Sequence, residues 1–316
     1  MILSFTSEVK KEICMQELSE CCKKAELSAF LQISASLNFT SEGAQISAKS
    51  ENVSTAKRIF TLVKELYDVE IELSVIKKMK LKKNNIYKIR IKNKALHILK
   101  DLDILVDGTF KEHPTSRIVK KECDARAYLA GAFLASGSVN SPQTTNYHLE
   151  IVANSEGLAK YLQRQMVKFR MNAKIIKRRN QQVVYLKASD QISDFLKCVG
   201  ASDSLFEFED KRIQRDFVNS ITRLDNCELA NEMKSIKAGK AQLEDIDRID
   251  NFVGLKSLPE NLYKVAILRQ DNPEASLNEL CEMYEAAYKE EISKSGIRHR
   301  LNKIKDIAQQ YKTNRE

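Results

Sequence analysis

The pattern of hydrophobic and polar positions repeats within the first two thirds of the chain. Residues 24–38 and 126–140 each predict an opening helix, and both end on Ser, a small residue, Ser, an aliphatic residue and Asn. The two stretches are offset by 102 residues. A short alternating strand follows each of them, at 46–50 and 149–153. The pattern therefore indicates an internal duplication.

Both copies continue with the same elements. A helix with an apolar stripe comes next, marked by Ile59, Val63 and Leu66 in one copy and by Leu162, Met166 and Phe169 in the other. Two strands and a closing helix follow, at 69–78, 86–92 and 95–105, and at 173–179, 183–187 and 192–200. The residues themselves thus predict helix, strand, helix, strand, strand, helix in each copy. This is an α+β arrangement whose sheets carry helices on one face.

One strand predicts a cationic face. In 86–92 the apolar Tyr87, Ile89 and Ile91 alternate with basic residues, and from Lys77 to Lys94 there are nine basic residues and no acid. A run of charged residues usually forms a solvated strand face, but such faces normally mix both signs of charge. Like charges alone repel one another unless an anion neutralises them. We therefore predict DNA phosphate contacts here and at the corresponding turn of the second copy. The predicted contacts are Lys77, Lys78, Lys80, Lys82, Lys83, Lys88, Arg90, Lys92, Lys177, Arg178 and Arg179.

The last third of the chain predicts helices only. One or two long helices lead to a short three-helix unit, in which Ser276 and Glu279 form a capping box and residues 285–291, EAAYKEE, connect the last two helices. The final helix has an apolar stripe that includes Ile297 and Leu301, and its other side is basic. That layout favours a helix-turn-helix over a merely solvated helix. The predicted DNA contacts are Lys294, Ser295, Arg298, His299, Arg300 and Lys303.

Composition supports a well-cored globular protein with a polyanionic partner. Of the 316 residues, 43% are hydrophobic and 30% charged, and the formal net charge is +9. We expect two domains. Their predicted parts are an N-terminal helix in 1–22, a tandem domain at 23–208 with repeats at 23–106 and 125–201, a helical linker at 209–254, and a helix-turn-helix domain at 255–316.

Cysteine spacing and hydropathy indicate whether the protein binds a metal, forms disulfides or crosses a membrane. The seven cysteines form no CxxC pair and no Cys/His cluster with zinc-ligand spacing, so we expect reduced thiols, and assign no metal and no cofactor. For the adjacent Cys21 and Cys22 we favour an ordinary helix-end pair over a metal or redox role. A signal peptide and a membrane span are not indicated, so we expect a cytoplasmic protein without a membrane partner. As a DNA-binding protein it is expected to be nucleoid-associated, and we expect no small-molecule substrate.

Two segments resemble a known motif. Leu129 to Gly137, LAGAFLASG, resembles the LAGLIDADG motif of homing endonucleases, and Leu27 to Ala35 resembles a weaker first copy. The resemblance implies two motif helices packed at a pseudo-two-fold axis, a saddle of sheets over DNA, and an acidic residue at each helix end that holds the catalytic metal. Small residues such as Gly131 and Ala135 suit that close packing.

The same resemblance implies that the nuclease chemistry is lost. The positions of the metal-binding acids are occupied by Ser34 and Ser136. A neutral hydroxyl is a poor substitute, because magnesium prefers anionic oxygen ligands. Glu26 and Glu150 are the displaced carboxylates that an active enzyme would need instead. We predict a protein that is not an enzyme.

Short motifs over the whole chain resemble the WhiA family. They are SFTSEVKKE at 4–12, NCELAN at 226–231, SLPENL at 257–262, NPEASLNEL at 272–280 and SKSGIRHRL at 293–301. This resemblance implies a bacterial transcriptional regulator, needed for sporulation in some lineages and tied to cell division and chromosome segregation in others. The fold class is then α+β, a duplicated LAGLIDADG-like αββαββα-type saddle domain followed by an all-α helix-turn-helix domain.

The leading hypothesis is a sequence-specific regulator that binds double-stranded DNA. In it, the last helix reads bases and the basic sheet face adds mostly nonspecific affinity. RNA polymerase or another regulator is a further candidate partner. Two alternatives remain: a nucleoid-associated factor in cell division or chromosome segregation without promoter regulation, and an active LAGLIDADG endonuclease with relocated carboxylates.

Overall fold

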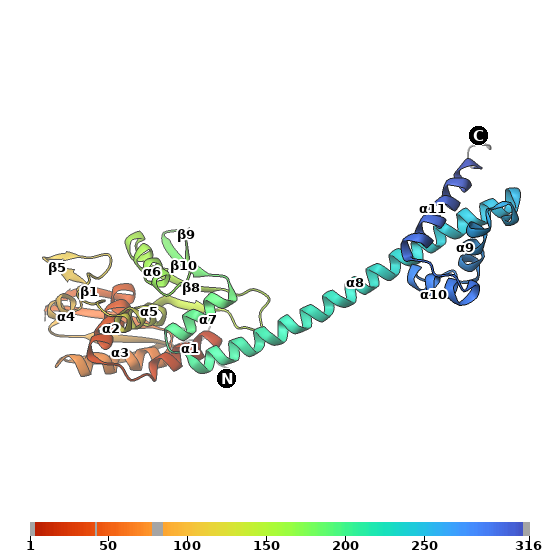
Figure 1. Ribbon diagram of the computed structural model, residues 1–316. Helices are drawn as coiled ribbons and strands as arrows, with labels where there is room; N and C mark the ends of the chain where they lie inside the picture. Colours follow the sequence, from red (N-terminus) through yellow and green to blue (C-terminus); the bar gives the residue numbers. More distant parts are fainter. Residues whose placement is uncertain (1–3, 42, 78–84, 312–316) are drawn as a thin grey trace. The chain divides into compact units, whose positions relative to one another are not determined.

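The computed structural model describes residues 4–41, 43–77 and 85–311 (Figure 1). Residue contacts divide the chain into two compact units, Met1–Arg215 and Asp216–Glu316. The division falls inside the long helix α8 (Ser202–Val253), which takes up the segment for which one or two long helices were predicted. Within the described residues no helix is both long enough and apolar enough to cross a bilayer.

The first unit contains the predicted duplication. Helix α1 (Phe5–Cys14) precedes two copies of the order helix, two strands, helix, two strands, helix. The first copy is α2 (Glu20–Ser34), β1 (Ala35–Thr40), β2 (Gly43–Ser50), α3 (Val53–Leu66), β3 (Ile71–Lys77), β4 (Asn85–Ile91) and α4 (Ala95–Asp101). The second copy is α5 (Glu122–Ser136), β7 (Gly137–Val139), β8 (Leu149–Ala153), α6 (Glu156–Lys168), β9 (Lys174–Arg178), β10 (Gln181–Leu186) and α7 (Ser189–Cys198). The αββαββα order is confirmed.

The residue pattern alone missed one strand in each copy. Both β1 and β7 begin at the residue that follows a helix, without the turn residues that usually separate two elements. Strand β1 is mostly exposed, and β7 is only three residues long. The residues of β1 do alternate between apolar and polar, but the predicted opening helices ran on to residues 38 and 140 and so covered the start of β1 and all of β7.

Each copy forms an antiparallel four-stranded sheet, in the orders β1-β2-β4-β3 and β7-β8-β10-β9. In the first sheet Ile46, Ile89 and Ile91 are buried against the helices, as the alternation of β4 predicts. The opposite face carries polar residues such as Lys49 and Lys88, which are directly paired across β2 and β4. We call this side the polar sheet face.

Helices α2 and α5 form the centre of the first unit (Figure 1). Leu27 and Phe30 of α2 and Leu129 and Phe133 of α5 are fully buried in one core. The helices approach so closely at Gly131 that a Cβ atom there would overlap the backbone carbonyl oxygen of Glu26 and lie 2.9 Å from its carbonyl carbon. The packing role predicted for Gly131 follows from this contact between backbones.

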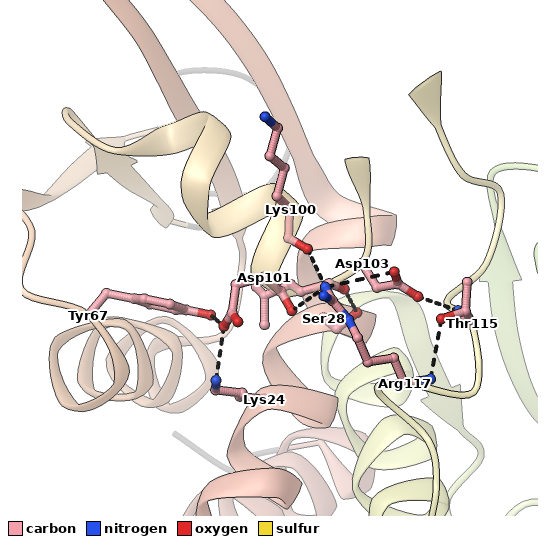
Figure 2. Close-up of polar contacts among 9 residues, drawn as sticks. Lys24, Ser28, Tyr67, Lys100, Asp101, Asp103, Thr115 and Arg117 are labelled. Atoms are coloured by element: carbon pink, nitrogen blue, oxygen red, sulfur yellow. Dashed lines mark hydrogen bonds and ion pairs between the residues drawn. The ribbon is translucent and has the colours of Figure 1, made fainter. Parts of the chain in front are cut away.

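The connection between the two copies is anchored at the end of α4 (Figure 2). Tyr67 donates a hydrogen bond of 2.7 Å to Asp101, and Lys24 lies 3.1 Å from the same carboxylate oxygen. Burial would raise the pKa of Asp101, but these two donors lower it below its usual value. The buried Asp103 accepts a hydrogen bond of 2.5 Å from the backbone N–H of Thr115. These bonds hold the connecting chain, with its hairpin β5 (Leu105–Val106) and β6 (Thr109–Phe110), against the first copy.

The second unit is helical. The end of α8, a short 3-10 turn η1 (Leu255–Ser257), α9 (Glu260–Asp271), α10 (Leu277–Tyr288) and α11 (Lys294–Gln310) share one core. The capping box at Ser276 and Glu279 is confirmed at the start of α10. The connection predicted at 285–291 is placed too early, because 285–288 continue α10 and the link to α11 runs over 289–293. Lys289, with φ of 54°, ends α10 in the left-handed conformation.

We expect Gly131→Ala to destabilise the first unit by about 2 kcal/mol or more, because the added methyl group meets helix backbone that cannot rotate away. Gly157→Ala is the matched control. A Cβ at Gly157 would meet the carboxylate of Glu112, which is the far end of a flexible side chain. Chemical denaturation followed by circular dichroism measures both variants. Equal stability of the two variants would refute the close approach of α2 and α5.

Candidate functional site

The exposed side of α11 is the first candidate surface. Ser293 caps the helix and accepts a hydrogen bond of 3.2 Å from the backbone N–H of Gly296. The predicted apolar stripe is buried, with Ile297, Leu301 and Ile304 inside the core of the second unit. The opposite side is therefore presented to solvent, and it carries five of the six predicted contacts: Lys294, Ser295, Arg298, His299 and Lys303.

Arg300 is arranged differently from these five residues. Its Nη1 donates a hydrogen bond of 2.7 Å to the hydroxyl of Tyr284, and its guanidinium lies 5.1 Å from the centre of that ring. Tyr284 in turn donates to Glu290 at 3.1 Å, and Glu290 pairs with Lys264 at 3.0 Å. Hydrogen bonds from Lys264 and Tyr284 hold the pKa of Glu290 below its usual value. Arg300 thus fastens α11 to α10.

Two residues on the exposed side of α11 were missed by the sequence reasoning. Asn302 and Lys305 are exposed, and they follow Arg298 by four and seven positions. All three therefore lie on one face of the helix. The same spacing rule that located the buried stripe would have found Asn302, had it been applied to the polar side.

The basic run of the first sheet is partly neutralised by the neighbouring strand. Arg90 lies 3.4 Å from Glu72, and Lys92 lies 2.9 Å from Glu70. The assumption of unbroken like charge on this face is therefore wrong, because β3 and the residues before it supply acids opposite β4. Lys88 faces Lys49 and Ser74 instead, so positive charge accumulates at that end of the polar sheet face.

The remaining predicted contacts of the first sheet are at or beyond the end of β3. Lys77 is its last residue and is exposed. Lys78, Lys80, Lys82 and Lys83 lie outside the described residues. Their predicted contact with phosphate stays a prediction.

The predicted basic cluster of the second copy is divided between two faces. Arg178 lies 3.4 Å from Glu150, whose carboxylate also interacts with His148 at 3.0 Å. Lys177 is next to Arg178 in β9, so its side chain lies on the opposite face of the sheet, the face covered by α6. There Lys160 lowers the pKa of Glu156, and the charge of Lys177 adds to this effect. Arg179 follows in the turn, with φ of 56°. The second sheet is therefore less basic than the first.

The positions of the former metal-binding acids end the two central helices. Ser34 is the last residue of α2 and donates a hydrogen bond of 2.7 Å to the carbonyl oxygen of Phe30. Ser136 is the last residue of α5 and donates at 2.7 Å to the carbonyl oxygen of Val152. Both hydroxyl protons are thus used in bonds to the backbone. These positions offer a cation no anionic oxygen.

The two displaced carboxylates are already engaged. Glu26 is 1% exposed and pairs with Arg58, whose Nε donates to it at 2.8 Å. Burial raises the pKa of Glu26, and the adjacent Arg58 opposes that rise. Glu26 also lies two helical turns before Ser34, and Glu150 is occupied by His148 and Arg178. Neither carboxylate replaces the missing acids at the helix ends.

Three family models match successive parts of the chain. They are the WhiA N-terminal LAGLIDADG-like domain at 20–105, the WhiA LAGLIDADG-like domain at 125–218 and the WhiA C-terminal HTH domain at 221–308. The duplication and the helix-turn-helix assignment are thereby confirmed.

Relatives and solved structures agree with these models. The chain is 46% identical to a "probable cell division protein WhiA" of Bacillus licheniformis, over 98% of both chains, and 46% identical to its namesake in Macrococcus caseolyticus, over 97% and 96%. The crystal structure of full-length DUF199/WhiA from Thermatoga maritima is 25% identical and covers 98% of this chain and 99% of that one, with a TM-score of 0.59. The chain belongs to the WhiA family.

Proposed function

We propose that this protein is a double-stranded DNA-binding transcriptional regulator without nuclease activity that acts in cell division. The observation that carries the proposal is the exposed side of α11, where Arg298, Asn302 and Lys303 project from a helix whose other side is buried. In helix-turn-helix proteins the corresponding helix enters the major groove. The printed name of the relatives supports the role in cell division.

The residues of α11 divide into base readers and phosphate contacts. Arginine forms bidentate hydrogen bonds with guanine, and asparagine forms them with adenine, so Arg298 and Asn302 are assigned to the bases. Lys294, Lys303 and Lys305 are point charges that suit phosphates. Arg300 supports the reader without touching DNA, because its guanidinium is held by Tyr284.

The polar sheet face is assigned a sequence-independent contribution. Lys49 and Lys88 are its cationic pair without an acid in the opposite register position, so a phosphate group is the complementary partner. Arg90 and Lys92 contribute less, since each already shares its charge with a glutamate. The sheet thus adds affinity while α11 selects the sequence.

The ends of α2 and α5 support the proposed loss of nuclease activity. A two-metal phosphodiester cleavage requires carboxylates to hold the ions against the phosphate charge. Ser34 and Ser136 supply neutral hydroxyls that are bonded to backbone carbonyls.

We extend the proposal to nucleoid association in the cytoplasm, to roles in sporulation or chromosome segregation, and to RNA polymerase or another regulator as a partner.

Binding to a DNA site selected from a random pool tests whether α11 makes the sequence-specific contacts and the polar sheet face the nonspecific ones. Arg298→Gln is expected to weaken the selected site by about tenfold to a hundredfold and to leave nonspecific DNA nearly unaffected. Lys88→Gln, which removes the same charge from the sheet, is expected to weaken both DNAs alike and to reduce the salt slope by about one. Fluorescence anisotropy at several salt concentrations measures both effects. Identical, sequence-independent losses would contradict the assignment.

Genome-wide occupancy tests regulation directly. The tagged wild-type protein is expected to occupy discrete promoter sites whose transcripts change when the gene is deleted, and Arg298→Gln is expected to lose those peaks. Lys88→Gln serves as the control, with weaker peaks at the same positions. Diffuse occupancy without transcript changes would favour a nucleoid-associated role and reject promoter regulation.

Incubation with supercoiled plasmid and Mg²⁺ tests the absence of cleavage. We expect the plasmid to stay intact, because neither helix end provides a carboxylate for the metal. Glu150→Gln is the control variant for any cleavage that appears. Cleavage by the wild type that this variant abolishes would show a relocated active site and overturn the proposal.

A further inference from the structure

Three cysteines and an aspartate meet at the ends of α2 and α5 opposite to Ser34 and Ser136. Cys21 and Cys22 lie in the first turn of α2, and Cys123 and Asp124 lie in the first turn of α5. Their three sulfur atoms and a carboxylate oxygen all lie within 4.8 Å of one another. Among the described residues, these four side chains form the cluster of His, Cys, Asp or Glu side chains whose spacing could hold a metal ion.

The duplication itself generates this group. The offset of 102 residues that relates the two motif helices also relates Cys21 to Cys123 and Cys22 to Asp124. Each copy therefore contributes two adjacent ligands from equivalent positions. The cysteines have no zinc-ligand spacing along the chain, because the four ligands come together only when the two helices pack against each other.

We propose that Cys21, Cys22, Cys123 and Asp124 form a Zn²⁺ site that clamps the two LAGLIDADG-like copies together. Four ligands suit the tetrahedral coordination of structural zinc, and thiolates favour zinc over magnesium or calcium. In a tetrahedral site with Zn–S bonds of about 2.3 Å, neighbouring sulfurs are about 3.8 Å apart. The observed separations therefore need to shorten by no more than about 1 Å.

Asp124 is already oriented for this role. It is 2% exposed, and its Oδ2 accepts hydrogen bonds from the backbone N–H groups of Lys121 at 2.9 Å and Lys120 at 3.3 Å. Its other oxygen, Oδ1, lies 3.8 Å from the sulfurs of both Cys22 and Cys123. Backbone hydrogen bonds thus fix Oδ2, while Oδ1 points toward the cysteine sulfurs. Such support of a ligand by hydrogen bonds is typical of metal sites.

The surrounding charge also favours the zinc-bound form. Three thiolates and a carboxylate carry more negative charge than one Zn²⁺ neutralises. The amino-terminal ends of α2 and α5 both point to this place, and the positive ends of their dipoles stabilise the remaining negative charge. Lys120 and Lys121 precede α5 and add two positive side chains.

Metal titration of the full-length, reduced protein tests the site. After removal of metal with a chelator, we expect one Zn²⁺ to bind per chain and to raise the melting temperature. Co²⁺ in place of Zn²⁺ is expected to give the visible bands of a tetrahedral ion and the sulfur-to-metal charge-transfer band. The Co²⁺ spectrum reports thiolate ligands in the wild type, so it does not depend on the folding of any variant.

A double variant locates the ligands. Cys21→Ser with Cys123→Ser is expected to weaken zinc binding by at least about a hundredfold. Both thiols are exposed, so their replacement leaves the core intact, which circular dichroism checks. Cys227→Ser, which removes an exposed thiol of α8, is the matched control and should bind zinc like the wild type. Equal zinc binding by the double variant, no thiolate bands with Co²⁺, or a Cys21–Cys123 disulfide in place of metal would overturn the proposal.

Discussion

The close approach of α2 and α5 is the constraint on which the first unit depends. Because Gly131 lacks a side chain, the backbone of one helix lies directly against the backbone of the other at Glu26. This contact brings the two copies of the repeat into one core, and each copy then carries its own four-stranded sheet. It also brings both ends of the helix pair together. One end holds Ser34 and Ser136, and the other holds the cysteines and Asp124.

The two ends of this helix pair have different chemistry. At the carboxyl ends, where the resemblance implies a former metal site, the serine hydroxyls are bonded to backbone carbonyls, and Glu150 is held by His148 and Arg178. At the amino ends, three sulfurs and one carboxylate oxygen converge. A helix pair whose carboxyl ends carry neutral serines can still be stabilised by a metal at its amino ends. In that arrangement the ion would join the copies and leave the sheets available for DNA.

Pairing between residues, rather than the number of charges, determines which basic residues are available to a polyanion. Glu70 and Glu72 neutralise part of a strand that is wholly basic along the chain. Arg300 lies between two exposed candidates in sequence, yet its guanidinium is bonded inside the second unit. Among the described residues, Lys49 and Lys88 on the polar sheet face and Arg298, Asn302 and the lysines of α11 are accessible to a polyanion. In the proposed regulator Arg298 and Asn302 provide the specific contacts, and the lysines of both surfaces provide the nonspecific ones.

The sequence by itself determined the duplication, the α+β class, the capping box of α10 and the buried stripe of α11, because these features depend on local periodicity and on residues a few positions apart. It also identified Gly131 as a packing residue, since only a small side chain suits that place. Strands β1 and β7 were missed because each follows its helix without a break, and only the pairing with β2 and β8 shows where the helix ends and the strand begins. The tertiary structure alone decided the ion pairs of Arg90 and Lys92, the inward role of Arg300 and the meeting of Cys21 with Cys123. In each case the partner lies on another strand or helix, and no local pattern encodes which distant side chains will become neighbours.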